Sequence, residues 1–392
     1  MMRPIWMPYV VVGLLFACGT KDNVNFSLAP DSKVEISIRD LSVDTLYLDS
    51  VPSSYMLFSG VYEDYLYVLD RRLCQLYRFE TSGKLRDKKL GIGHAKNETD
   101  IIRPDLHAFL SDGSLFMNNA NGDYYTYDAD FIYKERFRIH YNRRSDFTKS
   151  WEELYPSPYS YIDTDGQCCR AYGHRVFYSV CLSLRNGNDY FGQTENYLRQ
   201  AANIVEVDLD KQGFGRLLAV GYPDSYRERP LSKALFNKVR FDVADNGEFF
   251  VTYQADSLIY CYDETYRPVA CFGVEGTGMD KEYREFATKK ETYENAREEI
   301  SSRGFYNWLE WVDETGVLFR SYQKGDGADV DGLQIYRDGV LVGDVDVPKG
   351  LRVAGYVAPY YYSYVMPDEE REVLYVYSFS FEVSVTLDII YS

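Results

Sequence analysis

A phrase of two short strands recurs six times along this chain of 392 residues. A typical copy opens with a turn that contains Asp, Asn or Gly, continues with an apolar and aromatic strand, and is followed by a second strand; the last copy, residues 372–377, has the first strand alone. Asp-Gly and Asn-Gly turns supply the positive φ that a tight hairpin needs, and alternating apolar residues bury one face of a strand. The centres of the six copies are Leu66, Leu115, Phe177, Phe250, Leu318 and Leu374.

The spacing of these copies predicts the architecture. Successive centres lie 49 to 73 residues apart, and a four-stranded propeller blade takes about 40–50 residues, so insertions account for the excess. We therefore predict an all-β fold, a six-bladed β-propeller with a short helical insertion; a degenerate seventh blade is the alternative count. Residues 34–48 also alternate, and we expect them to supply a strand that closes the ring with the last blade. The alternative fold is a large β-sandwich or jelly roll.

The composition excludes some functions and leaves others open. With 43 Lys and Arg against 60 Asp and Glu, the formal net charge is −17, which is a poor basis for binding nucleic acid. A hydrophobic fraction of 45% can build a core, so a disordered chain is not expected. The 38 tyrosines fit half-buried strands, although tyrosine is also typical of binding surfaces.

The N-terminus has the features of an export signal. Arg3 precedes an almost wholly apolar stretch, residues 5–17, which is too short to span a bilayer but suits the core of a signal peptide. Leu15-Phe16-Ala17-Cys18 resembles a bacterial lipobox. We expect cleavage before Cys18 and lipid attachment to it; ordinary secretion with Cys18 left as a thiol is the alternative.

These features predict the organisation of the chain. A lipoprotein signal peptide covers residues 1–17, the lipidated cysteine and a tether cover 18–32, and the propeller covers 33–392. The expected location is the outer membrane, on its cell-surface or periplasmic face, with the lipid as the only membrane contact.

Six further cysteines carry no metal-binding pattern. C-x-x-C spacings are absent and the four histidines are scattered, so we expect neither a metal site nor a cofactor. Cys261 and Cys271 flank a predicted hairpin turn at residues 263–268 and could face each other across the two strands. The alternative, which we favour, is that they are two small buried hydrophobic residues.

One stretch carries a resemblance to a known family. Gly91-x-Gly93, Pro104, the segment 110–116 and Tyr127-Asp128 together resemble a degenerate NHL-type repeat. With the lipobox, the chain resembles the six-bladed, TolB-like propeller lipoproteins of Bacteroidetes, which are mostly families of unknown function. The resemblance implies the fold and the envelope location, and it implies no activity.

The segment around residues 279–303 predicts the helical insertion. Met279, Tyr283 and Phe286 follow helical spacing, and so do Tyr293, Ala296 and Ile300, but the two stripes are out of step. We therefore expect two helices, or a kink near residue 288. The insertion is expected to pack across one propeller face; a lid or a partner-docking helix is the alternative.

The candidate binding residues lie in the fifth blade. Arg303, Tyr306, Trp308 and Glu310 stand close together in the sequence. On a strand, Tyr306, Trp308 and Glu310 could form an aromatic platform beside a carboxylate, which suits a sugar or a peptide. The alternative is that they belong to the blade core. Two acidic stretches, 163–166 and 326–332, resemble calcium loops, but acidic turns explain them better.

No catalytic residue can be named from the sequence, because neither a Gly-x-Ser-x-Gly nor an H-E-x-x-H pattern is present. We expect a monomeric, non-catalytic module that binds or scaffolds a glycan, a peptide or an envelope protein. The alternative is a propeller enzyme, a glycan hydrolase or lyase that acts on polysaccharide. A purely structural envelope protein is a third reading.

Overall fold

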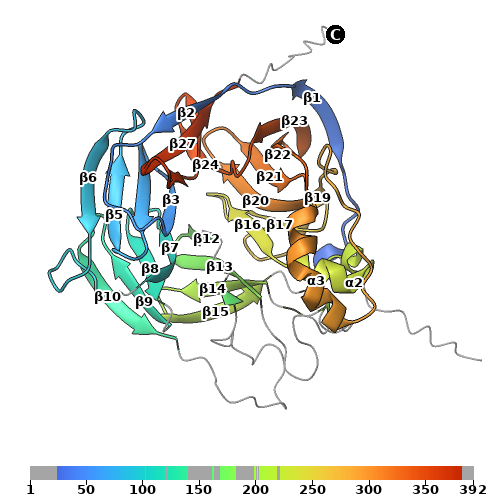
Figure 1. Ribbon diagram of the computed structural model, residues 1–392. Helices are drawn as coiled ribbons and strands as arrows, with labels where there is room; N and C mark the ends of the chain where they lie inside the picture. The colour runs from blue at the N-terminus through green and yellow to red at the C-terminus, as the bar shows by residue number, and fades with distance from the viewer. Residues whose placement is uncertain are drawn as a thin grey trace, which may run out of the picture.

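Six β-sheets form a closed ring in the computed structural model of the protein, so the predicted six-bladed propeller is confirmed (Figure 1). The structure describes residues 24–381 except 102, 120–121, 140–160, 163–167, 182–197, 200, 202 and 219–220. In each blade the first of the four main strands lies innermost, and these inner strands contact one another around the centre.

Blades 1 to 3 come from the first half of the chain. Blade 1 contains β3 (Leu57–Tyr62), β4 (Tyr65–Asp70), β5 (Gln75–Phe79) and β6 (Leu85–Leu90). Blade 2 contains β7 (Pro104–Phe109), β8 (Leu115–Asn119), β9 (Asp123–Tyr127) and β10 (Tyr133–Arg138). Blade 3 contains β12 (Cys169–Tyr172), β13 (Arg175–Cys181), β14 (Ile204–Asp208) and β15 (Gly213–Leu218), and the short β11 (Tyr161–Ile162) also pairs with β13.

Blades 4 to 6 complete the ring. Blade 4 contains β16 (Val239–Val243), β17 (Phe249–Tyr253), β18 (Ile259–Tyr262) and β19 (Pro268–Phe272). Blade 5 contains β20 (Phe305–Val312), β21 (Val317–Gln323), β22 (Val330–Arg337) and β23 (Val340–Pro348). Blade 6 contains β24 (Val353–Val357), β25 (Tyr360–Ser363) and β27 (Val373–Phe379), with β26 (Met366–Asp368) paired to β27.

The recurring sequence phrase corresponds to the middle of each blade. In blades 1 to 5 its centre lies on the second strand, whereas Leu374 lies on β27, the third strand of blade 6. A turn glycine of this phrase adopts the positive φ that a tight hairpin needs. Gly247 has a φ of +84°, and a Cβ at this position would come within 2.8 Å of the Tyr172 ring, so this turn needs a glycine both for its backbone and for its close packing.

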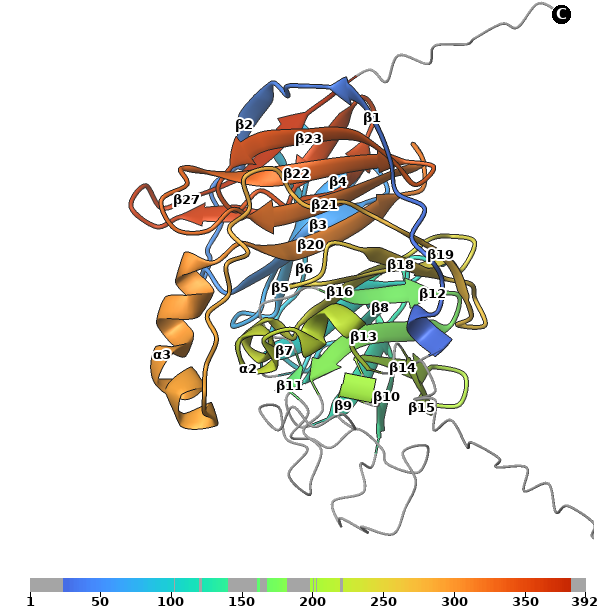
Figure 2. The same cartoon turned by 90° about the vertical axis from the view of Figure 1, so that its right-hand side faces the viewer.

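The N-terminal segment closes the ring in two places. The strand β2 (Val43–Tyr47) pairs antiparallel with β27 and becomes the outermost strand of blade 6, as predicted for residues 34–48. The preceding β1 (Lys33–Ile38) instead runs parallel to β23 and adds a fifth strand to blade 5 (Figure 2). The first and last parts of the propeller are therefore joined by backbone hydrogen bonds, which removes a free sheet edge.

Cys261 and Cys271 lie on the predicted hairpin, β18 and β19, but they do not face each other. The register places Cys261 opposite Ala270 and Cys271 opposite Tyr260. Successive side chains of a strand point to opposite faces, so the two thiols enter different packing layers. Both are buried and free, which confirms the alternative of two small buried hydrophobic residues.

The helical insertion is shorter than predicted. Only α3 (Lys289–Ser302) is helical, and Thr288 caps it by accepting a hydrogen bond from the Glu291 N–H. The prediction of a first helix over Met279, Tyr283 and Phe286 is wrong, because these residues lie in an irregular segment. They are nevertheless buried, since the segment packs against the blades rather than following helical periodicity.

Of the second predicted stripe, Ala296 is partly buried against the core, but the other two residues are exposed. Tyr293 is 58% exposed and Ile300 is 39% exposed, whereas Thr292 and Glu299 are buried. The reason is a polar anchor: Glu299 accepts hydrogen bonds from the Ser232 hydroxyl and the Arg284 N–H, which turns that side of the helix inward. Ser232 belongs to α2 (Pro230–Lys233), which lies beside α3 in Figure 1.

Several predictions concern residues outside the described part of the chain. The lipid attachment at Cys18 and the acidic stretch 163–166 are among them. In the other acidic stretch, Asp326 accepts a hydrogen bond from the Gly327 N–H and Asp331 one from the Gly350 N–H. Among the described residues, no group of His, Cys, Asp or Glu side chains could hold a metal ion, and no helix is long and apolar enough to cross a membrane.

Candidate functional site

Two of the four predicted site residues meet near the centre of the ring. Trp308 and Glu310 lie two positions apart on β20, the inner strand of blade 5, and the Trp308 indole N–H donates to Glu310 Oε2 at 3.0 Å. The same N–H also donates to the carbonyl of Val353 on β24. Both residues are buried.

The predicted platform of Tyr306, Trp308 and Glu310 does not form. A bulge at Asn307 shifts the register, since Tyr306 lies opposite Tyr322 but Trp308 lies opposite Ser321. An extra residue reverses the alternation of side chains along a strand. Tyr306 consequently packs in a separate cluster with Met279 and Tyr322.

The ion pairs of Arg303 involve neither the Trp308–Glu310 pair nor the cluster that contains Tyr306. It follows the last residue of α3 and pairs with Asp280 at 2.7 Å and with Glu299 at 3.5 Å. These contacts hold the end of the helix against the irregular segment before it. The structure thus assigns Arg303 to the anchoring of the insertion and not to a site with Trp308.

Arg170 joins two carboxylates that come from neighbouring blades. Its Nε donates to Asp242 Oδ1 at 2.6 Å, and its Nη2 donates to Glu310 Oε2 at 2.7 Å. The three residues lie on the inner strands β12, β16 and β20. We call Arg170, Asp242 and Glu310 the axial triad; their side chains are 14%, 7% and 11% exposed.

Blades 1, 2 and 6 supply neutral polar groups to the same region. The Tyr364 hydroxyl, just after β25, donates to Glu310 at 3.3 Å. The Tyr67 hydroxyl lies 2.9 Å from Nε2 of His107, and the His107 ring stacks on Phe58. Gly60 makes the position of Tyr67 possible, because a Cβ there would come within 2.7 Å of the tyrosine hydroxyl.

Burial perturbs these groups strongly. Removal from water raises the pKa of Glu310 to about 8; Arg170 opposes the rise and Asp242 adds to it. Burial also raises the pKa of Asp242 and lowers the pKa of His107 to about 3, so the imidazole is neutral. One guanidinium faces two carboxylates, so the triad carries an excess negative charge unless one carboxyl is protonated.

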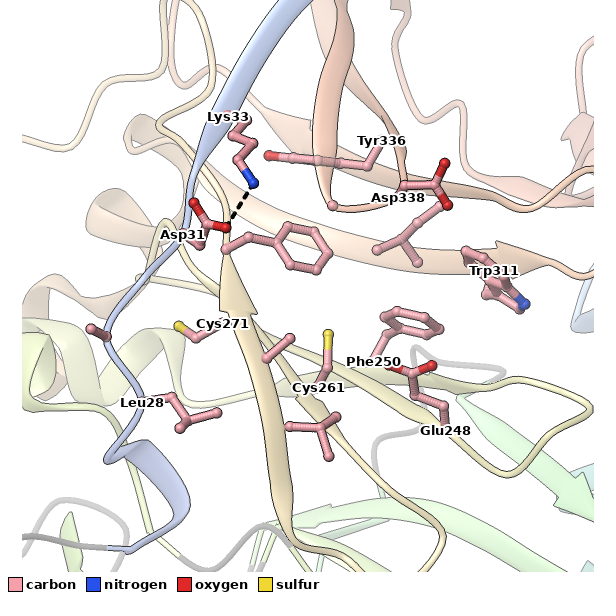
Figure 3. Close-up of a pocket in the computed structure, with 16 residues that line it drawn as sticks. Leu28, Asp31, Lys33, Glu248, Phe250, Cys261, Cys271, Trp311, Tyr336 and Asp338 are labelled. Atoms are coloured by element: carbon pink, nitrogen blue, oxygen red, sulfur yellow. Dashed lines mark hydrogen bonds and ion pairs between the residues drawn. The ribbon is translucent and has the colours of Figure 1, made fainter.

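A separate cavity opens between blades 4 and 5. It has a volume of about 460 Å³ and lies beneath the N-terminal strap, which we define as residues 24–33 (Figure 3). The strap is tied to blade 4 by the Asp31 N–H, which donates to the Cys271 carbonyl, and by the Ser32 hydroxyl, which donates to the Gly273 carbonyl. Phe26 fixes its start by packing edge-on against Tyr253 and Tyr260.

Most of the residues that line this cavity are apolar or aromatic, and four are charged. Phe250 of blade 4 stacks on Trp311 of blade 5 with ring centres 4.8 Å apart. The rings of Phe272 and Tyr336 also pack together, with their centres 5.5 Å apart. Cys261 and Cys271 line the same space. The volume lies in the range of small-molecule sites, which are typically apolar with a few polar groups.

Four charged side chains line the cavity, and only two of them form an ion pair with each other. Lys33 pairs with Asp31 at 2.8 Å on the strap. Glu248 and Asp338 lie on opposite walls near Trp311 (Figure 3), and neither has an ion-pair partner within the described part of the chain. Burial raises the pKa of Glu248.

The sequence contained only part of the signal for these sites. The spacing of Trp308 and Glu310 on a strand identified one member of the triad. Arg170 follows two cysteines, and Asp242 lies in an ordinary alternating strand, so neither stood out. The strap side of the cavity had no signal, because residues 24–32 were predicted to belong to the tether.

The comparisons with known proteins support the fold. No family model matches the chain, and no curated protein sequence matches it. A member of the DUF4221 family from Bacteroides vulgatus has a similar structure, with a TM-score of 0.61, 10% identity, and coverage of 87% of this chain and 98% of that one. A predicted exported protein of Bacteroides fragilis is 14% identical, with a TM-score of 0.48 and coverage of 89% and 98%. The chain is thus a six-bladed propeller whose fold is shared with a Bacteroides protein.

Proposed function

We propose that the protein is a non-catalytic binding module of the bacterial envelope and that its ligand enters the cavity between blades 4 and 5. The observation that carries the proposal is the cavity itself, with about 460 Å³ of space against an aromatic wall. The volume is that of a small-molecule site, and the aromatic wall offers an apolar ligand a surface on which to bury itself, so this cavity is our candidate binding site.

The axial triad is the competing candidate, because carboxylates with raised pKa values are typical of enzyme sites. Its partners argue against catalysis. Glu310 Oε2 accepts from Arg170, Trp308 and Tyr364, and Asp242 accepts from Arg170 and from two backbone N–H groups. These bonds hold both carboxylates in place inside the ring. We therefore do not assign the triad to glycan hydrolysis or lysis.

The location belongs to the same proposal. The signal-peptide features and the lipobox ending at Cys18 support a lipoprotein of the outer membrane, related to the TolB-like and NHL-type propellers. Only five residues separate Cys18 from the strap, so a lipid at Cys18 would hold the cavity close to the membrane surface. A peptide, a glycan or a segment of an envelope protein could reach it there.

An uncharged fluorescent probe, N-phenyl-1-naphthylamine, tests the cavity directly. We expect the purified full-length chain to bind this probe with a rise in its emission, because an apolar ring system would be transferred from water to the cavity. Ala270→Phe, which adds an aromatic side chain on the β19 wall, should abolish the rise. Ala287→Phe, which adds the same group at an exposed position, should leave it unchanged.

Two results would reject the cavity as the binding site. One is a chain that does not bind the probe at all, and the other is equal binding by the Ala270→Phe variant. Circular dichroism of both variants would establish that each keeps the propeller fold.

A further inference from the structure

The charged side chains are distributed unevenly between the two ends of the cavity. Figure 3 shows Leu28 and Cys271 toward one end, where Lys33 is paired with Asp31. The other end holds the Phe250–Trp311 stack, and Figure 3 shows Glu248 and Asp338 on either side of it.

The two carboxylates approach from different blades. Glu248 precedes β17 of blade 4, and Asp338 lies in the two-residue turn between β22 and β23 of blade 5. Asp338 and Gly339 have φ values of +49° and +75°, which fit a tight hairpin turn and bring this loop beside the cavity. The turn lies against blade 4, since a Cβ built at Gly339 would be 3.5 Å from the Phe272 ring.

We propose that the cavity selects an organic cation, an ammonium or guanidinium group joined to an apolar or aromatic body. This inference rests on the proposed function. The apolar body would fill the space over Phe272 and the thiols, and the cation would lie between Glu248 and Asp338 at the edge of Trp311. A free amine and a basic side chain of a peptide share this chemistry.

Two physical terms favour a cation over a neutral or anionic analogue. Glu248 and Asp338, which have no ion-pair partner in the described part of the chain, attract it. Glu248 is partly buried and its pKa is raised, so a cation that arrives beside it compensates the unfavourable burial of its charge. Lys33, already paired with Asp31, is the only cationic side chain among the described residues that line the cavity, so an anion would meet the same carboxylates with little compensation.

Three indoles that differ only at the end of the side chain provide the test: tryptamine, tryptophol and indole-3-acetate. Each would compete with N-phenyl-1-naphthylamine for the full-length chain at pH 7. We expect tryptamine to bind about tenfold more tightly than tryptophol, which corresponds to about 1.4 kcal/mol, and indole-3-acetate to bind more weakly than either.

The double variant E248Q/D338N removes both charges and keeps the side-chain shapes. Asn is well tolerated at the first position of such a turn, so the hairpin should be preserved. We expect the ratio of tryptamine to tryptophol affinity to fall below about threefold while tryptophol affinity stays the same. The matched control is E369Q/E370Q, which changes the net charge equally at two exposed positions of blade 6 and should keep the tenfold ratio.

The outcomes separate this inference from the proposed function. If the probe binds but tryptophol binds as tightly as tryptamine, the selectivity is wrong and the cavity remains a binding site. If the preference survives in E248Q/D338N, the two carboxylates do not cause it and the inference fails. Failure of the probe itself would reject the proposed function as well.

A second comparison distinguishes the sources of the cation. The blocked dipeptides Ac-Lys-Trp-NH₂ and Ac-Glu-Trp-NH₂ present the same indole with opposite charges. Tighter binding of the lysine peptide than of tryptamine indicates a peptide ligand, and the reverse order indicates a free amine. Equal affinities of the two peptides would contradict the charge selectivity.

Discussion

Glu310→Gln should change how the stability of the propeller depends on pH. Three donors converge on Glu310 Oε2, from Arg170, Trp308 and Tyr364. A glutamine can accept the same hydrogen bonds through its amide oxygen, and its NH₂ takes the place of the protonated second oxygen. The variant therefore mimics the neutral carboxylic acid and cannot ionise.

The direction and the size of this change in stability follow from the raised pKa of Glu310. The pKa of Glu310 is raised from its ordinary value of 4.5 to about 8 in the folded protein. The folded state then holds a proton that the unfolded chain has released, so stability is full below about pH 4.5 and falls as the pH rises toward 8. At 1.36 kcal/mol per pKa unit, the wild type loses on the order of 5 kcal/mol across this range.

Urea denaturation at a series of pH values measures the effect, with tryptophan fluorescence and circular dichroism as readouts. Other titrating groups are common to both proteins and cancel in the difference. Wild type and Glu310→Gln should be nearly equal in free energy of unfolding at about pH 5, and the variant should be several kcal/mol more stable at about pH 9. Glu285→Gln, at an exposed position, should follow the wild type. Parallel curves for Glu310→Gln and wild type would refute the reasoning.

Three other changes test further parts of the structure. Arg170→Met leaves two buried carboxylates without their cation and should cost about 3–5 kcal/mol of unfolding free energy at pH 7, and less at pH 5, in the same urea experiment. Gly60→Ala introduces a Cβ within 2.7 Å of the Tyr67 hydroxyl and should destabilise the protein by about 1–3 kcal/mol, seen as a lower thermal midpoint. Cys18→Ser should abolish radiolabelled palmitate incorporation and move the protein from the membrane to the soluble fraction, because the lipid is its proposed anchor.

The fold was largely predictable because its signals are local. Each blade contains a hairpin whose turn residues and alternating strands are adjacent in the sequence, so six copies could be recognised separately. The role of β2 could also be foreseen, since a ring of sheets needs its last edge closed. The parallel pairing of β1 with β23 could not, because the partners lie about 300 residues apart and no local pattern specifies the register.

In the helical insertion, the spacing of apolar residues did not predict which face of the helix is buried. Tyr293 and Ile300 have helical spacing, but the inward face of α3 is set by Glu299, whose hydrogen bonds reach Ser232 and Arg284. The buried Glu299 carboxylate is held there by these hydrogen bonds and by its ion pair with Arg303, which offset the cost of removing its charge from water. Those partners lie outside the helix and cannot be read from its sequence.

The sequence by itself determined the hairpins within the blades and predicted six blades with a seventh as the alternative, because hairpin formation depends on neighbouring residues. The tertiary structure alone decided the sites. Ring closure brings Arg170 to Asp242 and Glu310 across up to 140 residues of chain, and the strap meets two blades to enclose the cavity. Electrostatic and packing interactions act between residues that are close in space, and that proximity is a property of the closed ring rather than of any segment of it.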